Sequence, residues 1–144
     1  MLDDRPVTWT RGAYRVTTDR ALVSLDDALA LLHDTHWGGT LARDVLARAM
    51  RNSVCFALLD GERLVGFARA VTDLATYAYL TDVVVAATAR GQGLGAWIVE
   101  CILDHPDLQR LRRITLLTRD VPAFYERLGF TPGTGDRHYF ERRA

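Results

Sequence analysis

The stretch from Tyr79 to Ala96 constrains the fold of this chain more than any other. Its first half, residues 79–85, is almost wholly apolar and β-branched, which predicts a strand buried on both faces of a sheet. Its second half carries glycine at positions 91, 93 and 95. Apolar residues then recur at helical spacing, namely Leu94, Trp97, Ile98, Cys101 and Ile102. The sequence therefore predicts a buried strand, a glycine loop and a helix in direct succession.

A unit of this kind provides a site for phosphate groups. Glycine lets the backbone approach a ligand closely, and the start of a helix offers unpaired N–H groups and positive potential. The dinucleotide fingerprint G-x-G-x-x-G fits poorly, because the spacing from Gly93 to Gly95 is one residue too short. The loop that binds nucleoside triphosphates ends in lysine, and all 18 basic residues here are arginine. The pattern therefore favours another phosphate ligand.

Length and composition are typical of one soluble globular domain. The chain has 144 residues, of which 49% are hydrophobic and 25% are charged, so we expect residues 1–144 to form a single domain. Residues 1–12 are polar and are expected to be a weakly ordered lead-in or an early strand. The formal net charge is zero, which gives no reason to expect nucleic acid or an anionic membrane as a partner.

Sequence segments also bear on location and on metal binding. The N-terminus lacks the apolar core of a signal peptide and no apolar run approaches membrane-spanning length, so we expect a cytoplasmic protein. Cys55 and Cys101 both lie in apolar patterns and are expected to be buried thiols. The four histidines lack metal-ligand spacing with carboxylates or cysteines, so no metal is expected.

Capping signals place three further helices. Ser24 is expected to cap the first, with Asp27 three residues later as in a capping box. Thr40 is expected to cap the second. Asp120 is expected to cap a third, short helix, which has Pro122 in its first turn and is closed by Gly129. The helix after the glycine loop should end near His105, because a residue before proline avoids helical geometry.

Apolar runs and turn residues place the remaining strands. The Asp60-Gly61 pair indicates a hairpin between two apolar strands. The expected strands, besides residues 79–85, are residues 13–17, 54–59, 64–71 and 114–117, with two last strands at Phe130 and at residues 138–141.

Two motifs resemble a known family. Residues 90–95, Arg-Gly-Gln-Gly-Leu-Gly, resemble the acyl-CoA pyrophosphate loop of the GNAT N-acetyltransferase superfamily, Arg/Gln-x-x-Gly-x-Gly/Ala. Residues 125–130, Tyr-Glu-Arg-Leu-Gly-Phe, resemble the closing motif of that superfamily. The order of elements also agrees from about Tyr14 onward, and several segments resemble a generic bacterial subgroup. Pro122-Ala123-Phe124 departs from the small, histidine or asparagine residues that are more usual before the tyrosine.

The resemblance implies a fold and an activity. The fold would be α/β (α+β), a mixed twisted sheet of six to seven strands with about four helices in the order β-α-α-β-β-β-α-β-α-β-β. The activity would be acetyl-CoA-dependent N-acetyl transfer (EC 2.3.1.-), directly from the thioester to a primary amine of a small molecule or peptide. A CoA-binding regulatory or degenerate module without transferase activity is the alternative. The resemblance does not identify the acceptor amine, and it is compatible with a homodimer.

The resemblance also assigns the cofactor-binding residues. The strand end would meet the pantetheine arm through backbone hydrogen bonds, and one of its N–H groups would polarise the thioester carbonyl. The glycine loop and the helix start would hold the pyrophosphate. The residues concerned are Val83, Val84, Val85, Arg90, Gly91, Gln92, Gly93, Leu94, Gly95 and Ala96.

Tyr125 and Asp82 are the candidate catalytic residues. The family places a tyrosine that protonates the departing thiolate where Tyr125 stands; a core tyrosine packing on its neighbours is the alternative. Asp82 is a carboxylate within an apolar strand, and a buried carboxylate without a partner is costly and poised to take a proton. The alternative is that Asp82 pairs with Arg69 on the neighbouring strand and orders the sheet.

Four residues are candidates for the acceptor side. Asp73 could recognise a cationic acceptor, and an ordinary turn aspartate is the alternative. Arg69 stands on the strand next to Asp82. His36 and Trp37 lie between the first two helices, where the superfamily lines its acceptor pocket; a pair at the surface or core edge is the alternative.

Overall fold

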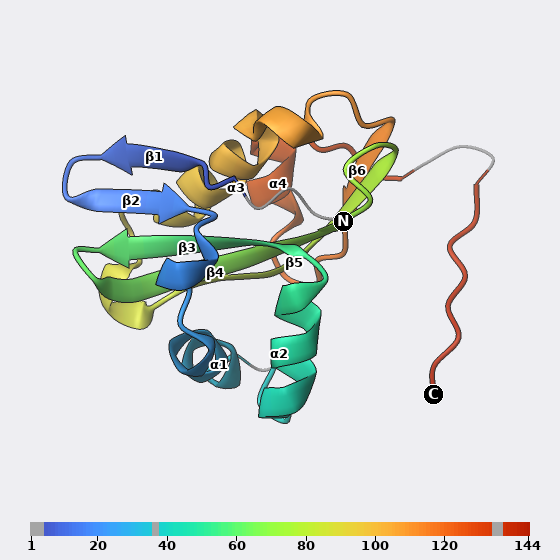
Figure 1. Ribbon diagram of the computed structural model, residues 1–144. Helices are drawn as coiled ribbons and strands as arrows, with labels where there is room; N and C mark the ends of the chain where they lie inside the picture. The colour runs from blue at the N-terminus through green and yellow to red at the C-terminus, as the bar shows by residue number, and fades with distance from the viewer. Residues whose placement is uncertain (1–4, 36–37, 134–136) are drawn as a thin grey trace.

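Within the described part of the chain, six strands form one mixed sheet whose spatial order follows the sequence (Figure 1). The computed structural model describes residues 5–35, 38–133 and 137–144. The strands are β1 (Thr8–Arg11), β2 (Tyr14–Thr17), β3 (Val54–Asp60), β4 (Arg63–Thr72), β5 (Tyr77–Val85) and β6 (Arg113–Leu116). Neighbours from β1 to β5 pair antiparallel, and β5 pairs parallel with β6. This mixed sheet confirms the expected fold class.

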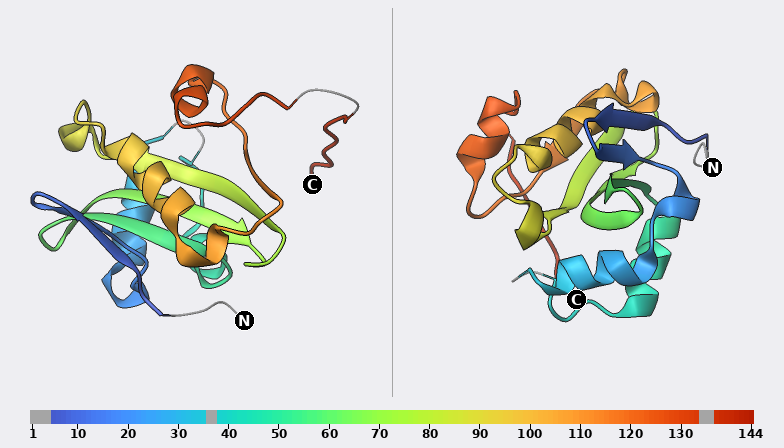
Figure 2. Two further views of the ribbon diagram at one scale, coloured as in Figure 1. Left: turned by 90° about the horizontal axis from the view of Figure 1, so that it is seen from above. Right: turned by 90° about the vertical axis from the view of Figure 1, so that its left-hand side faces the viewer.

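Helices cover both faces of the sheet (Figure 2). The α-helices of the described residues are α1 (Leu25–His33), α2 (Arg43–Arg51), α3 (Leu94–Asp104) and α4 (Pro122–Arg127). The same described residues also form three short 3-10 turns, η1 (Arg20–Leu22), η2 (Ala87–Ala89) and η3 (Pro106–Leu108). The pair α1 and α2 lies on one face, and α3 and α4 lie on the other. No helix within the described ranges is both long and apolar enough to cross a bilayer.

The central strand β3 explains why this arrangement has two cores. Its side chains alternate, so that Phe56 and Leu58 join the core under α3 while Ala57 and Leu59 join the core under α1 and α2. All four are buried. A strand covered on both faces reads as a continuous apolar run, which is how residues 54–59 read in the sequence.

Several local signals act as expected. The Ser24 hydroxyl accepts a hydrogen bond from the Asp27 amide at 3.2 Å, and α1 begins at the next residue after Ser24. Gly61 and Gly129 have φ of 61° and 94°, in the left-handed region that glycine adopts readily. The helix α3 ends at Asp104, before His105. Cys55 and Cys101 are both free and buried.

Two predicted caps are wrong. The N-cap of α2 is Ala42 rather than Thr40, and the N-cap of α4 is Val121 rather than Asp120. Neither Ala42 nor Val121 makes a side-chain cap hydrogen bond. Pro122 occupies the first turn of α4, where its fixed φ suits the helix and its missing N–H is not needed. Backbone geometry thus starts α4 without a polar cap.

The N-terminal segment is a strand and not a loose lead-in over residues 8–11. The Trp9 indole donates to Asp104 at the end of α3 at 2.8 Å, and the Arg11 guanidinium stacks over the Trp97 ring at 4.9 Å. Both contacts tie β1 to α3, so β1 closes one edge of the sheet. Residues 1–4 lie outside the described residues.

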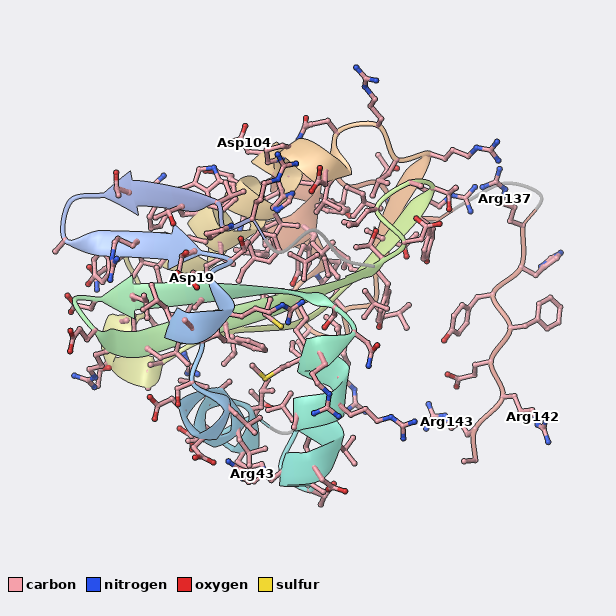
Figure 3. All side chains as sticks on the ribbon, in the orientation of Figure 1. Asp19, Arg43, Asp104, Arg137, Arg142 and Arg143 are labelled. Atoms are coloured by element: carbon pink, nitrogen blue, oxygen red, sulfur yellow. The ribbon has the colours of Figure 1, made fainter. Side chains whose placement is uncertain are left out.

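The two strands expected at the C-terminal end are not formed in the described residues. Phe130 packs against Tyr125, at 5.9 Å between ring centroids, without joining the sheet. Residues 137–144 run as an extended segment beside the body, and Arg142 points away from it (Figure 3). Tyr139 and Phe140 are 67% and 86% exposed. An extended segment becomes a strand only where a partner edge is in reach, and local sequence does not report that.

Candidate functional site

The pairing of β5 with β6 stops halfway along β5. Residues 77–80 face Arg113–Leu116, whereas residues 81–85 have no partner on this side among the described strand pairings. Val83 and Val85 are consequently half-buried, which corrects the expectation of a strand buried on both faces throughout. The second half of β5 therefore presents free backbone groups along one edge, directly before the glycine loop.

The glycine loop ends in an uncapped helix N-terminus. Gly91 and Gly93 have φ of 82° and 73°, which explains why glycine stands at both positions. Gly93 is the N-cap of α3 and has no side-chain cap hydrogen bond. A Cβ at Gly91 or Gly93 would meet no atom within 4 Å. The backbone that leads into the first turn of α3 thus borders open space, and an anion site at a helix start needs such space.

The polar residues of the loop hold it to the strands. The Arg90 side chain donates through Nε to the Val85 carbonyl at 3.1 Å. The Gln92 amide oxygen accepts from the Tyr14 hydroxyl at 3.3 Å. Tyr14, on β2, is a residue that motif reasoning missed, and nothing in its local sequence indicates this contact. These bonds fix the loop against both β5 and β2.

Helix α4 lies across from the loop and packs against it through Phe124. An added Cβ on Gly95 would lie 3.7 Å from both the Phe124 ring and the Val85 side chain. Strand end, helix start and α4 therefore meet at Gly95. Phe124, which departs from the usual small residue, thus places its ring beside Gly95, where an added Cβ would still make an ordinary van der Waals contact.

Tyr125 stands next to this junction and is half-buried. Its ring packs edge-on against Phe124 and Phe130, with centroids at 4.9 and 5.9 Å. Its hydroxyl makes no hydrogen bond with any residue that the structure describes. Burial raises the pKa of Tyr125 above its usual value. The phenol is therefore protonated at neutral pH and can donate a proton.

Strand β5 contains a β-bulge at Asp82 and Val83. Phe67 faces Val84 and Arg69 faces Thr81, so that the single residue between them on β4 faces two residues of β5. Asp82 has φ of 59°, in the left-handed region that few residues other than glycine, asparagine and aspartate adopt. The bulge turns the backbone of β5 just where the pairing with β6 has ended.

The side chain of Asp82 forms an ion pair with Arg69. The Nε of Arg69 lies 2.6 Å from Oδ2 of Asp82, and the two side chains are only 13% and 11% exposed. Another nitrogen of Arg69 donates to the Ser53 hydroxyl at 3.2 Å, which in turn donates to the Ala49 carbonyl in α2 at 2.6 Å. The Asp82–Arg69 pair, which the sequence offered as the alternative to a free base, therefore exists.

Ser53 is a residue that sequence reasoning missed. It is 1% exposed and joins the Arg69–Asp82 pair to the last turn of α2. The available signal was a lone hydroxyl residue at the start of an apolar strand, which must find hydrogen-bond partners when it is buried.

The carboxylate of Asp73 is hydrogen-bonded within the β4–β5 turn. It accepts from the amides of Ala75, Thr76 and Tyr77 and from the Thr76 hydroxyl, at 2.6 to 3.3 Å. These bonds, led by the Thr76 hydroxyl, hold the pKa of Asp73 well below its usual range. The geometry is that of a turn aspartate. His36 and Trp37 lie outside the described residues, so the structure places neither.

The groups at this site are thus arranged around the free half of β5. The glycine loop, Phe124 and Tyr125 are gathered at its end, and Arg69 and Asp82 meet at its bulge. Asp73 is set apart in the β4–β5 turn. Among the described residues, no three His, Cys, Asp or Glu side chains are grouped as metal ligands would be.

Comparisons with known proteins agree with this geometry. The sequence profile of the acetyltransferase (GNAT) domain matches residues 51–132, which include the bulge, the loop and α4. A Gibberella zeae protein named as an acetyltransferase, FG08082, is 35% identical over 87% of this chain and 83% of its own length.

Solved structures show the same fold. A Xanthomonas campestris pv. campestris protein assigned to the GNAT family is 37% identical, with a TM-score of 0.86 over 91% of this chain and 93% of its own. SA2161 of Staphylococcus aureus is 22% identical, with a TM-score of 0.74 over 91% of this chain and 99% of its own, and shares the fold.

Proposed function

Because this chain belongs to the GNAT family of acetyltransferases, we propose that it transfers an acetyl group from acetyl-CoA to a primary amine of a small molecule or peptide. The observation that carries the proposal is the uncapped start of α3 beside the unpaired half of β5. A helix start with glycine at its cap suits a pyrophosphate. A free strand edge suits the amide-bearing pantetheine arm, because each can pair with the other through backbone-type hydrogen bonds.

The proposed chemistry follows from these positions. The amine nitrogen attacks the thioester carbonyl carbon, and an N–H of residues 83–85 stabilises the oxygen that becomes negative. The carbon–sulfur bond then breaks, and the thiolate takes a proton from Tyr125. The amine loses a proton to Asp82, directly or through water. Arg69 holds the Asp82 carboxylate in place, so the proton acceptor has a fixed position.

The proposal also covers the setting of the enzyme. Residues 1–144 act as one catalytic domain in the cytoplasm, with acetyl-CoA and an amine as its ligands and without a metal, nucleic acid or membrane. Zero net charge supports the last two points. Oligomeric state is measured directly by light scattering, with monomer and homodimer as the outcomes.

The test combines binding with turnover. Acetyl-CoA and CoA should raise the melting temperature, whereas ATP and NAD should leave it unchanged, because only a ligand of the native state stabilises it. A panel of primary amines is then screened for thiol released from acetyl-CoA, with amine-free reactions as the control for hydrolysis. Release that depends on an amine supports the proposal. Binding of acetyl-CoA with no amine-dependent release over the panel would favour a degenerate CoA-binding module instead.

A further inference from the structure

A cavity of about 220 Å³ opens beside α2, on the face of the sheet that α1 and α2 cover. Val23, after η1, and Leu25, the first residue of α1, line it on one side, and Ala47 and Met50 line it from α2. Cys55 of β3 contributes to the same lining. The glycine loop starts α3 on the other face of the sheet (Figure 2), so this cavity is separate from the proposed acetyl-CoA site.

The charges around the cavity are positive. Arg20 and Arg51 complete the lining, and no residue of the lining is acidic. Arg20 is committed to the protein, because its guanidinium donates to the carbonyls of Met50 and Ser53 at 2.7 and 2.8 Å. Asp19, labelled in Figure 3, caps η1 through its side chain and so fixes the turn that carries Arg20.

The guanidinium of Arg51, unlike that of Arg20, has no partner among the described residues. Arg51 is the exposed last residue of α2 and makes no side-chain hydrogen bond or ion pair with any residue in the described part of the chain. A guanidinium presents several donors in a planar fork, which matches the two oxygens of a carboxylate. Its place beside an apolar cavity therefore suits a ligand with an apolar body and a carboxylate end.

The thiol of Cys55 is a neutral, unreactive part of the cavity lining. It lies 3.6 Å from the Met50 carbonyl, and burial raises its pKa above the usual value. The thiol is therefore uncharged and unreactive at neutral pH. With Val23, Leu25, Ala47 and Met50 around it, the interior is apolar. Binding inside this cavity would be driven by burial of apolar surface.

We propose that this cavity binds a small apolar monocarboxylate, with its ring or short chain against Ala47 and its carboxylate on Arg51. The size agrees, because this cavity of about 220 Å³ is partly open to solvent, and a closed apolar cavity of about 150 Å³ already holds benzene. A carboxylate is favoured over a neutral or cationic end by the two guanidinium groups. The ligand and its site are independent of acetyl transfer, so the test requires no turnover.

Three probes of nearly the same shape separate charge from apolar fit. Benzoate, benzamide and benzamidine carry a negative, a neutral and a positive end on one ring. Each is titrated to about 10 mM, in the range expected for a ligand of this size, and amide chemical shifts report the position and the dissociation constant. Benzoate should shift the amides of Val23 and Ala47 and bind at least about tenfold more tightly than benzamidine. Absence of binding by benzoate, or equal binding by all three probes, would overturn the proposal.

Variants on α2 test the two halves of the site. Arg51→Gln should remove most of the preference for benzoate over benzamide, with Arg20 left as the one cation of the lining. The matched control Arg48→Gln, exposed on the same helix and outside the cavity, should leave the preference intact. Ala47→Phe should fill the cavity and weaken both probes at least about tenfold. Equal effects of the two arginine variants would sink the assignment of Arg51. Because Arg51 is exposed, its variant should fold even if Ala47→Phe does not.

Discussion

Asp82 is held through both its backbone and its side chain. The backbone takes the left-handed conformation at the bulge, and the carboxylate pairs with Arg69. The pairing could be anticipated from sequence, because two opposite charges on adjacent apolar strands have few other partners. The bulge could not, since it depends on how β4 and β5 align, and neither strand contains a glycine or proline at that point.

The first prediction separates charge from backbone at Asp82. Asp82→Asn keeps a residue type that tolerates positive φ, so the bulge should persist while the charge is lost. Arg69 would then be a largely buried cation without its partner, and we expect a loss of about 3 kcal/mol in the free energy of unfolding. Urea unfolding measures this. The double variant Arg69→Gln with Asp82→Asn should recover part of the loss, and an unchanged single variant would contradict the importance of the pair.

The same variant tests the base. If Asp82 takes the amine proton, the acidic limb of the wild-type pH–rate profile should vanish or move in Asp82→Asn. An unaltered limb, measured under conditions where the variant is folded, would restrict Asp82 to its structural role and leave the proton to a water chain or another residue.

Tyr125 offers a second test at the residue scale. Because its hydroxyl makes no hydrogen bond with the described residues, Tyr125→Phe should leave the melting temperature unchanged. The value of kcat should fall about 10²-fold or more, with little change in KM for acetyl-CoA. Tyr139→Phe, which removes a hydroxyl from the exposed C-terminal segment, is the matched control. A variant with normal kcat would make Tyr125 a packing residue.

The pH dependence of Tyr125 has a definite sign. Burial raises its pKa, so the phenol stays protonated at all pH values below its usual value of about 10. Loss of the acid by deprotonation should therefore not lower the wild-type rate below about pH 10. A fall in kcat at lower pH that Tyr125→Phe abolished would contradict this assignment.

At the scale of elements, sequence signals predict caps and turns reliably where they depend on neighbouring residues. They fail where the boundary of an element depends on tertiary contacts. The Ser24 cap and the turn at Gly61 involve residues within three positions of one another, and both are confirmed. Tertiary packing sets the start of α2, and Pro122 sets the start of α4. The caps predicted at Thr40 and Asp120 therefore lie two positions and one position before the observed caps. The unit of β5, the glycine loop and α3 depends on both short-range and long-range contacts. The sequence predicts the order of its elements, but not that residues 81–85 of β5 lack a partner in β6.

The glycine loop yields a prediction about this unit. Gly93→Glu would place a carboxylate at the start of α3, where we propose that the pyrophosphate binds, and should weaken acetyl-CoA at least about tenfold in calorimetry. Gly93→Gln is the matched control, because it carries the same strain at φ of 73° without the charge. A folded Gly93→Glu variant with the affinity of Gly93→Gln would exclude a charge effect at this position.

The β4–β5 turn yields a prediction on acid stability. The hydrogen bonds to Asp73 lower its pKa, so its stabilising effect is present above the unfolded value of about 4 and is lost as pH falls through the folded value. Asp73→Asn should lower the melting temperature at pH 7, and the difference from wild type should shrink as the pH falls below about 4. Asp60→Asn, at the end of β3, is the control. A difference that did not depend on pH would contradict the role of the charge.

At the scale of the whole molecule, the sheet between its helices was predictable and its ends were not. Apolar runs such as residues 54–59 report burial on both faces, and this fixes the central strands. The ends depend on contacts far apart in sequence: β1 is tied to α3 through Trp9 and Asp104, and the expected strand at residues 138–141 has no pairing partner among the described strands.

The last prediction concerns this C-terminal segment. The hydrogen bonds from Tyr139 and Arg143 to Glu141 lie within the segment itself, and Phe140 is 86% exposed, so residues 137–144 bury little apolar surface. A chain that ends at Asp136 should therefore melt within about 2 °C of the full chain and keep its dependence on urea. Phe56→Ala, which empties a fully buried position of β3, should by contrast cost about 3 to 5 kcal/mol. If the shortened chain instead lost many degrees, residues 137–144 would have to pack on the sheet, as the sequence pattern at residues 138–141 first indicated.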